Sequence, residues 1–70
     1  MFIKITEVPS NSISKHRKAA GLTQEDLAIK VGITRQTVIA IEKGNYTPSV
    51  LLALKLAQIL DKPVGELFWL

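Results

Sequence analysis

The stretch TQEDLAIKVGITRQTVIAIEKG, residues 23–44, contains two short helical segments separated by one glycine-isoleucine pair. Thr23, with Asp26 three residues later, is typical of a capping box and predicts the start of the first segment, while Gly32 predicts its end. Thr34 is predicted to cap the second segment, which stops at the next glycine. Because only two residues connect them, the two helices are expected to cross steeply, at roughly 90–120°.

Apolar side chains recur at helical spacing along one side of both segments and predict an inner face. Ala28 lies one turn before Gly32, where a larger side chain would push the second helix away. The other side of the second helix is therefore expected to face outward. The predicted inner face consists of Leu27, Ala28, Val31, Ile33, Val38 and Ile41.

The outward side of the second helix carries a mixed set of side chains that fits a base-reading surface. Arg35 can bridge two acceptors on guanine, and Gln36 can pair with adenine. Ile39 and Ala40 can pack on thymine methyl groups, although Ile39 is equally explained by a protein contact or by no contact at all. A helix braced in this way fits a major groove about 12 Å wide. We predict Arg35, Gln36, Ile39 and Ala40 as DNA base-reading residues.

Polar side chains around this surface are suited to phosphate rather than base contact. Gln24 stands at the start of the first helix, and Lys43 stands at the end of the second. For Tyr46, packing over the loop is an equal alternative to phosphate contact. The predicted phosphate contacts are Gln24, Thr34, Lys43, Asn45 and Tyr46.

The N-terminal part predicts a short strand followed by a basic helix. FIKITEV, residues 2–8, alternates imperfectly between apolar and polar side chains and stops at Pro9. Any of the three polar residues 10–12 can cap a helix that runs from Ile13 to Ala20. We interpret the lysines of this helix as a solvated side rather than as a DNA-facing patch.

The C-terminal part predicts two more helices. Thr47 is expected to cap the first of them, with Pro48 in its first turn. Its apolar residues cover more than one side, so we expect it to be the central core helix, buried on several sides. Asp61 ends it, and a brief last helix is expected to run from Pro63 to Leu70.

The composition restricts the class of protein. The chain has 70 residues, of which 47% are hydrophobic and 21% charged, as expected for one small folded domain. It has no cysteine, its single His16 lacks a second ligand at metal spacing, and it has no glycine-rich phosphate loop. We therefore expect no metal, no cofactor and no catalytic residues. The longest apolar run, Val50 to Leu54, is too short to cross a bilayer, so no membrane partner is expected.

The segment GLTQEDLAIKVGITRQTVIAIEKGNYTPS resembles the core of the lambda-repressor-like regulators, the Cro/CI or XRE-type helix-turn-helix proteins, and the likeness covers about residues 12–68. It implies an all-α, compact five-helix DNA-binding domain whose second and third helices contact DNA, usually as a dimer on a palindromic site. A helix-turn-helix domain is then expected at residues 10–70, preceded by a strand or arm at residues 1–9. The sequence departs from the family pattern at His16, Ile39, Asp61 and Lys62.

The resemblance also assigns roles to individual positions. Gln24 matches a phosphate-binding glutamine of the family, Arg35 and Gln36 match base readers, and Ala40 matches a third groove-facing position. Arg17 and Glu42 match residues that form a structural ion pair inside the fold.

These features lead to one main hypothesis about function and one alternative. The main hypothesis is a cytoplasmic, nucleoid-associated transcriptional regulator, expected to be a repressor, that binds double-stranded DNA as a homodimer. A net charge of +3 is in keeping with an anionic partner. The alternative is a protein-interaction module of the same fold, such as an antitoxin or a bridging co-activator, with a protein partner. We expect one or both chain ends, including Trp69 and Leu70, to form the dimer contact.

Overall fold

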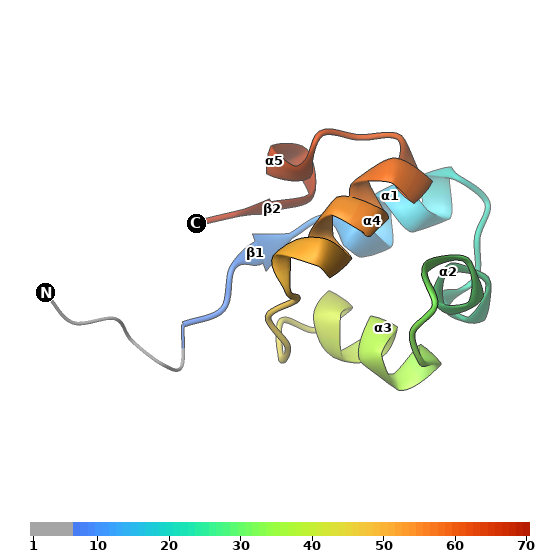
Figure 1. Ribbon diagram of the computed structural model, residues 1–70, viewed down its shortest axis with the longest axis horizontal. Helices are drawn as coiled ribbons and strands as arrows, with labels where there is room; N and C mark the ends of the chain where they lie inside the picture. The colour runs from blue at the N-terminus through green and yellow to red at the C-terminus, as the bar shows by residue number, and fades with distance from the viewer. Residues whose placement is uncertain (1–6) are drawn as a thin grey trace, which may run out of the picture.

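The computed structural model describes residues 7–70, and within that range five helices follow one another along the chain (Figure 1). Two short strands pair antiparallel, with Ser10 opposite Trp69 and Asn11 opposite Phe68. The prediction of an all-α, compact five-helix domain is confirmed for the five helices, and the structure adds a two-stranded sheet. The elements are β1 (Ser10–Asn11), α1 (Ile13–Ala19), α2 (Gln24–Val31), α3 (Arg35–Glu42), α4 (Val50–Leu60), α5 (Val64–Leu67) and β2 (Phe68–Trp69).

The strands of the sheet do not coincide with the predicted N-terminal strand at residues 2–8. Residues 2–6 of that strand lie outside the described residues, and Glu7 and Val8 have no regular secondary structure. Strand β1 begins after Pro9, and its partner β2 replaces the predicted end of the last helix. The backbone N–H of Ser12 also donates to the carbonyl of Leu67 at 2.9 Å. Pairing between the two ends of a chain is not visible in local sequence periodicity, which is why it was missed.

The corner between α2 and α3 follows the sequence prediction closely. Thr23 and Asp26 form the reciprocal capping box, and Thr34 caps α3 by accepting from the N–H of Thr37. Gly32 adopts φ 82°, and its N–H donates to the carbonyl of Ala28 at 2.9 Å. In Figure 1, α2 is seen nearly end-on while α3 lies across the view, so the two helices are far from parallel.

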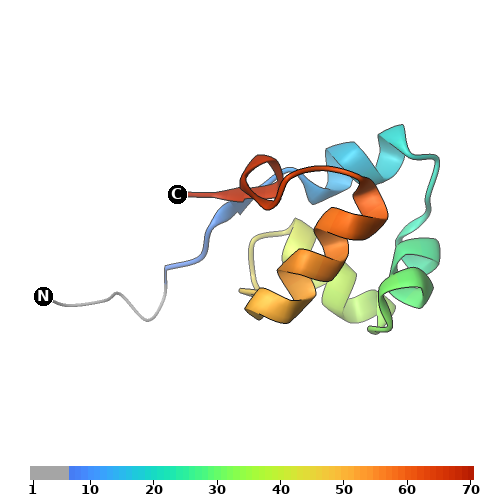
Figure 2. The same cartoon turned by 45° about the horizontal axis from the view of Figure 1, so that its top comes forward.

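The core lies where α2, α3 and α4 meet, with α1 and α5 closing it (Figure 2). Ala28 is 2% exposed at the helix corner, which is consistent with the need for a small side chain there. The predicted inner residues of α2 and α3 are all buried. The buried apolar side chains are Ile13, Leu27, Ala28, Val31, Val38, Ile41, Leu52, Leu56, Leu60 and Leu67, with Ile33 partly buried against them.

Helix α4 differs from its prediction in two respects. Its N-cap is Ser49 rather than Thr47, because the Ser49 side chain is the one that reaches the N–H of Leu52, at 3.1 Å. Pro48 therefore precedes the helix and does not lie in its first turn. It is also buried along one side only, where it packs against α2 and α5. A 70-residue domain has too few elements to surround a helix, and four large apolar residues of α4 therefore stay exposed. These are Val50 at 78%, Leu51 at 63%, Leu54 at 51% and Ile59 at 38% exposure.

The end of α4 and the last helix were predicted in part. Asp61 ends α4 in a left-handed conformation with φ 54°. Helix α5 then covers only Val64–Leu67 and buries Leu67 completely. Phe68 and Trp69 extend away from it as β2. Aromatic residues favour strands, and here the partner strand β1 was available to pair with them.

Candidate nucleic-acid interface

The outer side of α3 has exposed residues at its two ends and half-buried residues between them. Arg35 and Gln36 are exposed in its first turn, and Lys43 is exposed just after its end. Ile39 and Ala40 are half-buried between them. On the opposite side, Val38 and Ile41 are each 1% exposed, which fixes the rotation of the helix. The four residues predicted to read bases therefore lie on one side of one helix.

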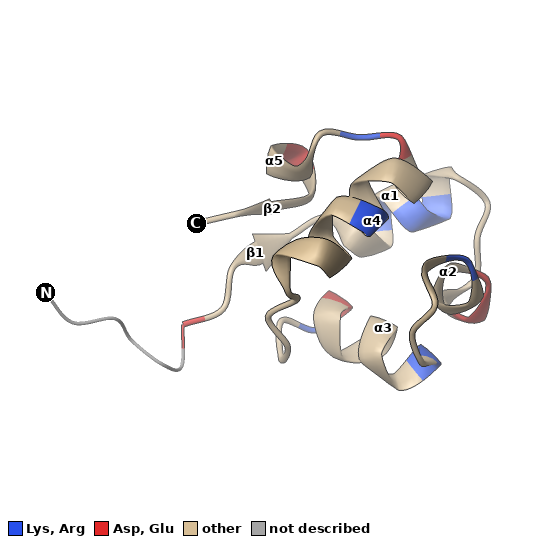
Figure 3. Ribbon diagram, in the orientation of Figure 1, with Lys and Arg blue, Asp and Glu red and all other residues tan. Residues whose placement is uncertain are grey.

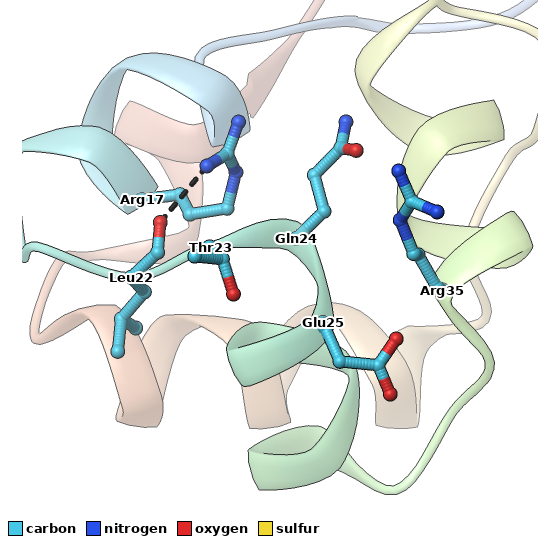
Figure 4. A pocket seen from close by; sticks show the side chains of 6 residues that line it. All are labelled: Arg17, Leu22, Thr23, Gln24, Glu25 and Arg35. Carbon is cyan, nitrogen blue, oxygen red and sulfur yellow. Dashed lines mark hydrogen bonds between the residues drawn. The ribbon is translucent and has the colours of Figure 1, made fainter.

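A cleft of about 560 Å³ separates the start of α2 from the start of α3. In Figure 4 the Gln24 side chain extends into this space between Arg17 and Arg35, and the Glu25 carboxylate lies on the Arg35 side. The cleft therefore brings a predicted phosphate contact and a predicted base reader together. Its lining residues are Arg17, Leu22, Thr23, Gln24, Glu25 and Arg35.

Two residues that line this cleft, Arg17 and Gln24, belong to a hydrogen-bond network centred on Glu42. Arg17 donates to the two carboxylate oxygens of Glu42, from Nε at 2.7 Å and from Nη2 at 3.2 Å. The Arg17 Nη1 donates to the carbonyl of Leu22 at 2.9 Å, and Gln24 Nε2 donates to Glu42 Oε1 at 3.1 Å. Both charged side chains are only 9% exposed. The network joins α1, α2 and α3 and holds the Gln24 amide in one orientation.

Sequence reasoning missed the bond between Gln24 and Glu42. Its signal was present in part, because both residues had been assigned roles by the family resemblance. The two are 18 residues apart, however, and only the crossing of α2 over α3 brings them within hydrogen-bond distance.

The loop after α3 carries the remaining predicted phosphate contacts. Gly44 adopts φ 76°, and the N–H of Asn45 donates to the carbonyl of Ala40 at 2.9 Å, so the loop is tied to the end of the helix. Asn45 is exposed, and Tyr46 is 43% exposed. Tyr46 also lines a groove of about 260 Å³ beside Ile33 and Leu51. Its side chain therefore borders this groove while part of it reaches solvent.

Charged residues of both signs are distributed over the helices (Figure 3). Basic segments lie on α1 and at the two ends of α3, and the acidic pair Glu25 and Asp26 stands in the first turn of α2. The N–H of Thr23 donates to the Asp26 carboxylate at 2.9 Å and lowers the pKa of that carboxyl group. Within the described residues there is no cluster of three potential metal ligands. Nor does any helix of that range have the length and hydropathy to cross a membrane.

Two capped helices joined at a left-handed glycine, with the second helix open on its outer side, define the helix-turn-helix class of DNA-binding proteins. The match to known proteins agrees with this assignment. Residues 13–67 match the Helix-turn-helix family model, and the chain belongs to that family. It is a transcriptional regulator with a helix-turn-helix DNA-binding domain rather than an enzyme.

Similar proteins come from both archaea and bacteria. An uncharacterised HTH-type transcriptional regulator of Methanothermobacter thermautotrophicus is 58% identical over 50 residues, covering 71% of this chain and 72% of that protein. The regulator YgzD of Bacillus subtilis is 48% identical over 60 residues, covering 86% of this chain and 91% of that protein. Among solved structures, the restriction-modification controller protein C.AhdI of Aeromonas hydrophila is 41% identical with a TM-score of 0.74, covering 80% and 85% of the two chains.

Proposed function

We propose that the protein is a sequence-specific repressor that binds a palindromic site in double-stranded DNA as a homodimer. The observation that carries this proposal is the open outer side of α3, opposite the buried Val38 and Ile41. A helix presented in this way can enter the major groove without any rearrangement of the domain.

Base reading is assigned to the two planar polar side chains at the start of α3 and to the apolar residues behind them. Arg35 suits the two acceptors of guanine, and Gln36 suits adenine. Ile39 and Ala40 are half-buried, so they present small apolar surfaces that suit thymine methyl groups. The exposure of Arg35 and Gln36 supports this order of contacts along the helix.

Phosphate contacts are assigned to residues on either side of α3. A primary amide has two N–H donors; in Gln24 one is bound to Glu42, and the second can donate to a phosphate oxygen. The Thr34 hydroxyl caps α3 and is exposed at the same end of the helix. At the other end of α3, phosphate contacts are assigned to Lys43, Asn45 and Tyr46. These contacts give affinity and register rather than sequence preference.

A homodimer is supported by apolar surface that one copy leaves uncovered. Val50, Leu51 and Leu54 lie on the outer side of α4 within little more than one turn. Monomers rarely keep such a patch in water, and a second copy would cover it. Trp69 and Leu70 at the C-terminus, 47% and 97% exposed, are a second such surface, in line with the contact expected at the chain ends. A two-fold dimer would place its two α3 helices about 34 Å apart, one turn of DNA.

Repression follows from occupancy, because a dimer bound in two successive major grooves excludes other proteins from that stretch. The similarity to a restriction-modification controller protein supports a role in gene control. Because the proposed target is double-stranded DNA, the protein is expected to act at the nucleoid in the cytoplasm.

Selection of bound sequences from a random duplex pool tests the proposal. We expect a palindromic consensus whose half-sites are about one helical turn apart. Gln36→Ala should relax the preference at one base pair per half-site by roughly 1–3 kcal/mol, while Gln24→Ala should weaken all sites alike. A pool without any consensus would refute sequence-specific binding.

The salt dependence of binding separates this proposal from the protein-interaction module. Neutralising about 6–10 phosphates should lower the DNA affinity by roughly 10³–10⁵ between 50 and 200 mM salt. If instead DNA binding is absent and an apolar protein contact persists at both salt concentrations, the protein-interaction function gains support.

A further inference from the structure

Asn11 connects the sheet at the two chain ends to the last turn of α3. Its side-chain Nδ2 donates to the carbonyl of Ile41 at 2.9 Å, across 30 residues of sequence. Its Oδ1 accepts from the N–H of Ile13 at 3.1 Å, at the start of α1. Its backbone stands opposite Phe68 in the sheet. One half-buried residue therefore touches three separate elements.

The two hydrogen bonds fix which way the Asn11 amide faces. Its neighbour at Ile13 is an N–H donor and its neighbour at Ile41 is a carbonyl acceptor, so only one orientation of the amide satisfies both. The Ile41 carbonyl also accepts from the N–H of Gly44 at 3.0 Å. The Ile41 carbonyl in the last turn of α3 thus accepts two hydrogen bonds, one from the following loop and one from Asn11.

The locked turn belongs to the helix assigned to DNA reading. Ile41 is buried at 1% exposure, and it lies between the base-reading candidate Ala40 and the network centre Glu42. Strands β1 and β2 lie at the opposite end of the molecule from α2 (Figures 1 and 2). The bond from Asn11 therefore holds the end of α3 that is remote from the helix corner.

We propose that Asn11 is a positioning residue for DNA recognition, which sets the placement of the C-terminal half of α3 in the groove. This inference rests on the proposed DNA-binding function. The cap at Thr34 and the corner at Gly32 hold the first turn of α3, and so Arg35 and Gln36 stay in place without Asn11. Ala40 and Lys43, in contrast, belong to the turn that the Asn11–Ile41 bond holds together with the Arg17–Glu42 pair.

Asn11→Asp tests the proposal, because aspartate has the same shape. The carboxylate still accepts from the Ile13 N–H, and an acid is favourable at the start of a helix. It cannot donate to the Ile41 carbonyl, and it places a second acceptor oxygen against it. We expect the preference at the base pairs that face Ile39 and Ala40 to fall by at most about tenfold, because losing one hydrogen bond cannot shift the placement of α3 by more than that bond's net stability. The preference at the base pairs that face Arg35 and Gln36 should persist.

Ile29→Glu is the control for charge, because it also adds one carboxylate and lies on the exposed side of α2, away from every residue assigned a contact. Added negative charge weakens all DNA sequences alike, so this variant should keep the wild-type pattern of base preference. A merely structural role of Asn11 would likewise weaken all sites equally. The proposal is overturned if Asn11→Asp leaves the relative base preferences unchanged.

A measurement on the wild-type protein covers the case in which Asn11→Asp fails to fold. The Asn11 side-chain amide should exchange its hydrogens with water at least tenfold more slowly than the exposed amide of Asn45, because it is held by a hydrogen bond. Equal exchange of the two amides would overturn the proposal. A wild-type protein without any base preference would refute the proposed function itself, and this inference with it, whereas an intact consensus that Asn11→Asp does not alter refutes this inference alone.

Discussion

Arg17 of α1 and Glu42 of α3 form a two-point ion pair, 25 residues apart in the sequence, with a shortest N–O distance of 2.7 Å. Each side chain is 9% exposed, so neither charge can regain its hydration without opening the fold. The pair ties the end of α3 to α1, and Glu42 also accepts a hydrogen bond from Gln24.

Arg17→Met should lower the free energy of unfolding by about 3–5 kcal/mol, because it leaves the Glu42 carboxylate buried without its partner. Urea unfolding measures this quantity. Lys18→Ala is the matched control, since Lys18 is exposed on the same helix, and its effect should stay within about 0.5 kcal/mol. A loss below about 1 kcal/mol for Arg17→Met would show that the pair is not needed for stability.

Gly32→Ala should destabilise the protein by about 1 kcal/mol, because alanine is strained at φ 82°. Gly65→Ala should instead stabilise it by about 0.4–1 kcal/mol, since it restricts the unfolded chain without requiring a left-handed backbone. An added methyl group meets nothing within 4 Å at either position, so the two variants differ in backbone conformation and not in packing. Equal shifts in urea midpoint would contradict this reading of the helix corner.

The capping box predicts a specific loss of stability in acid. Hydrogen bonding from the Thr23 N–H lowers the pKa of Asp26 in the folded protein below its value of about 3.9 in the unfolded chain. The resulting stabilisation is complete about one pH unit above the unfolded-state pKa and is lost as the pH falls through the lower, folded-state pKa. Unfolding free energies measured between pH 7 and pH 2 should therefore fall less steeply in acid for Asp26→Asn. Glu25→Gln, which removes a neighbouring acid outside the capping box, should retain the wild-type fall caused by Asp26.

Leu54→Lys should dissociate the proposed dimer, because it places a charge in the middle of the apolar side of α4. Sedimentation measures the effect, and Lys55→Ala on the same helix should leave the dimer intact. Separate loss of the dimer in Trp69→Ser, or in a chain lacking residues 1–8, would move the contact to the chain ends. The dimer is excluded if the wild-type protein sediments as a monomer at all concentrations and also binds DNA as a monomer.

Local sequence signals determined the helix corner. The capping and stop signals at this corner act on backbone groups only a few residues away, so they can be predicted without knowing the tertiary structure. They come from Thr23, Asp26, Gly32 and Thr34. The buried side of α2 and α3 was predictable for the same reason, since helical periodicity alone decides which residues share a side. The open surface with Arg35 and Gln36 follows directly from it.

Contacts between distant segments were decided by the tertiary structure alone. The bond from Asn11 to Ile41, the pairing of β1 with β2 and the exposure of Leu54 all depend on which elements come to lie side by side. An apolar residue on a helix looks the same in sequence whether a neighbouring helix covers it or water does. A single amide likewise reveals its partner only when a fold brings a carbonyl within 3 Å of it.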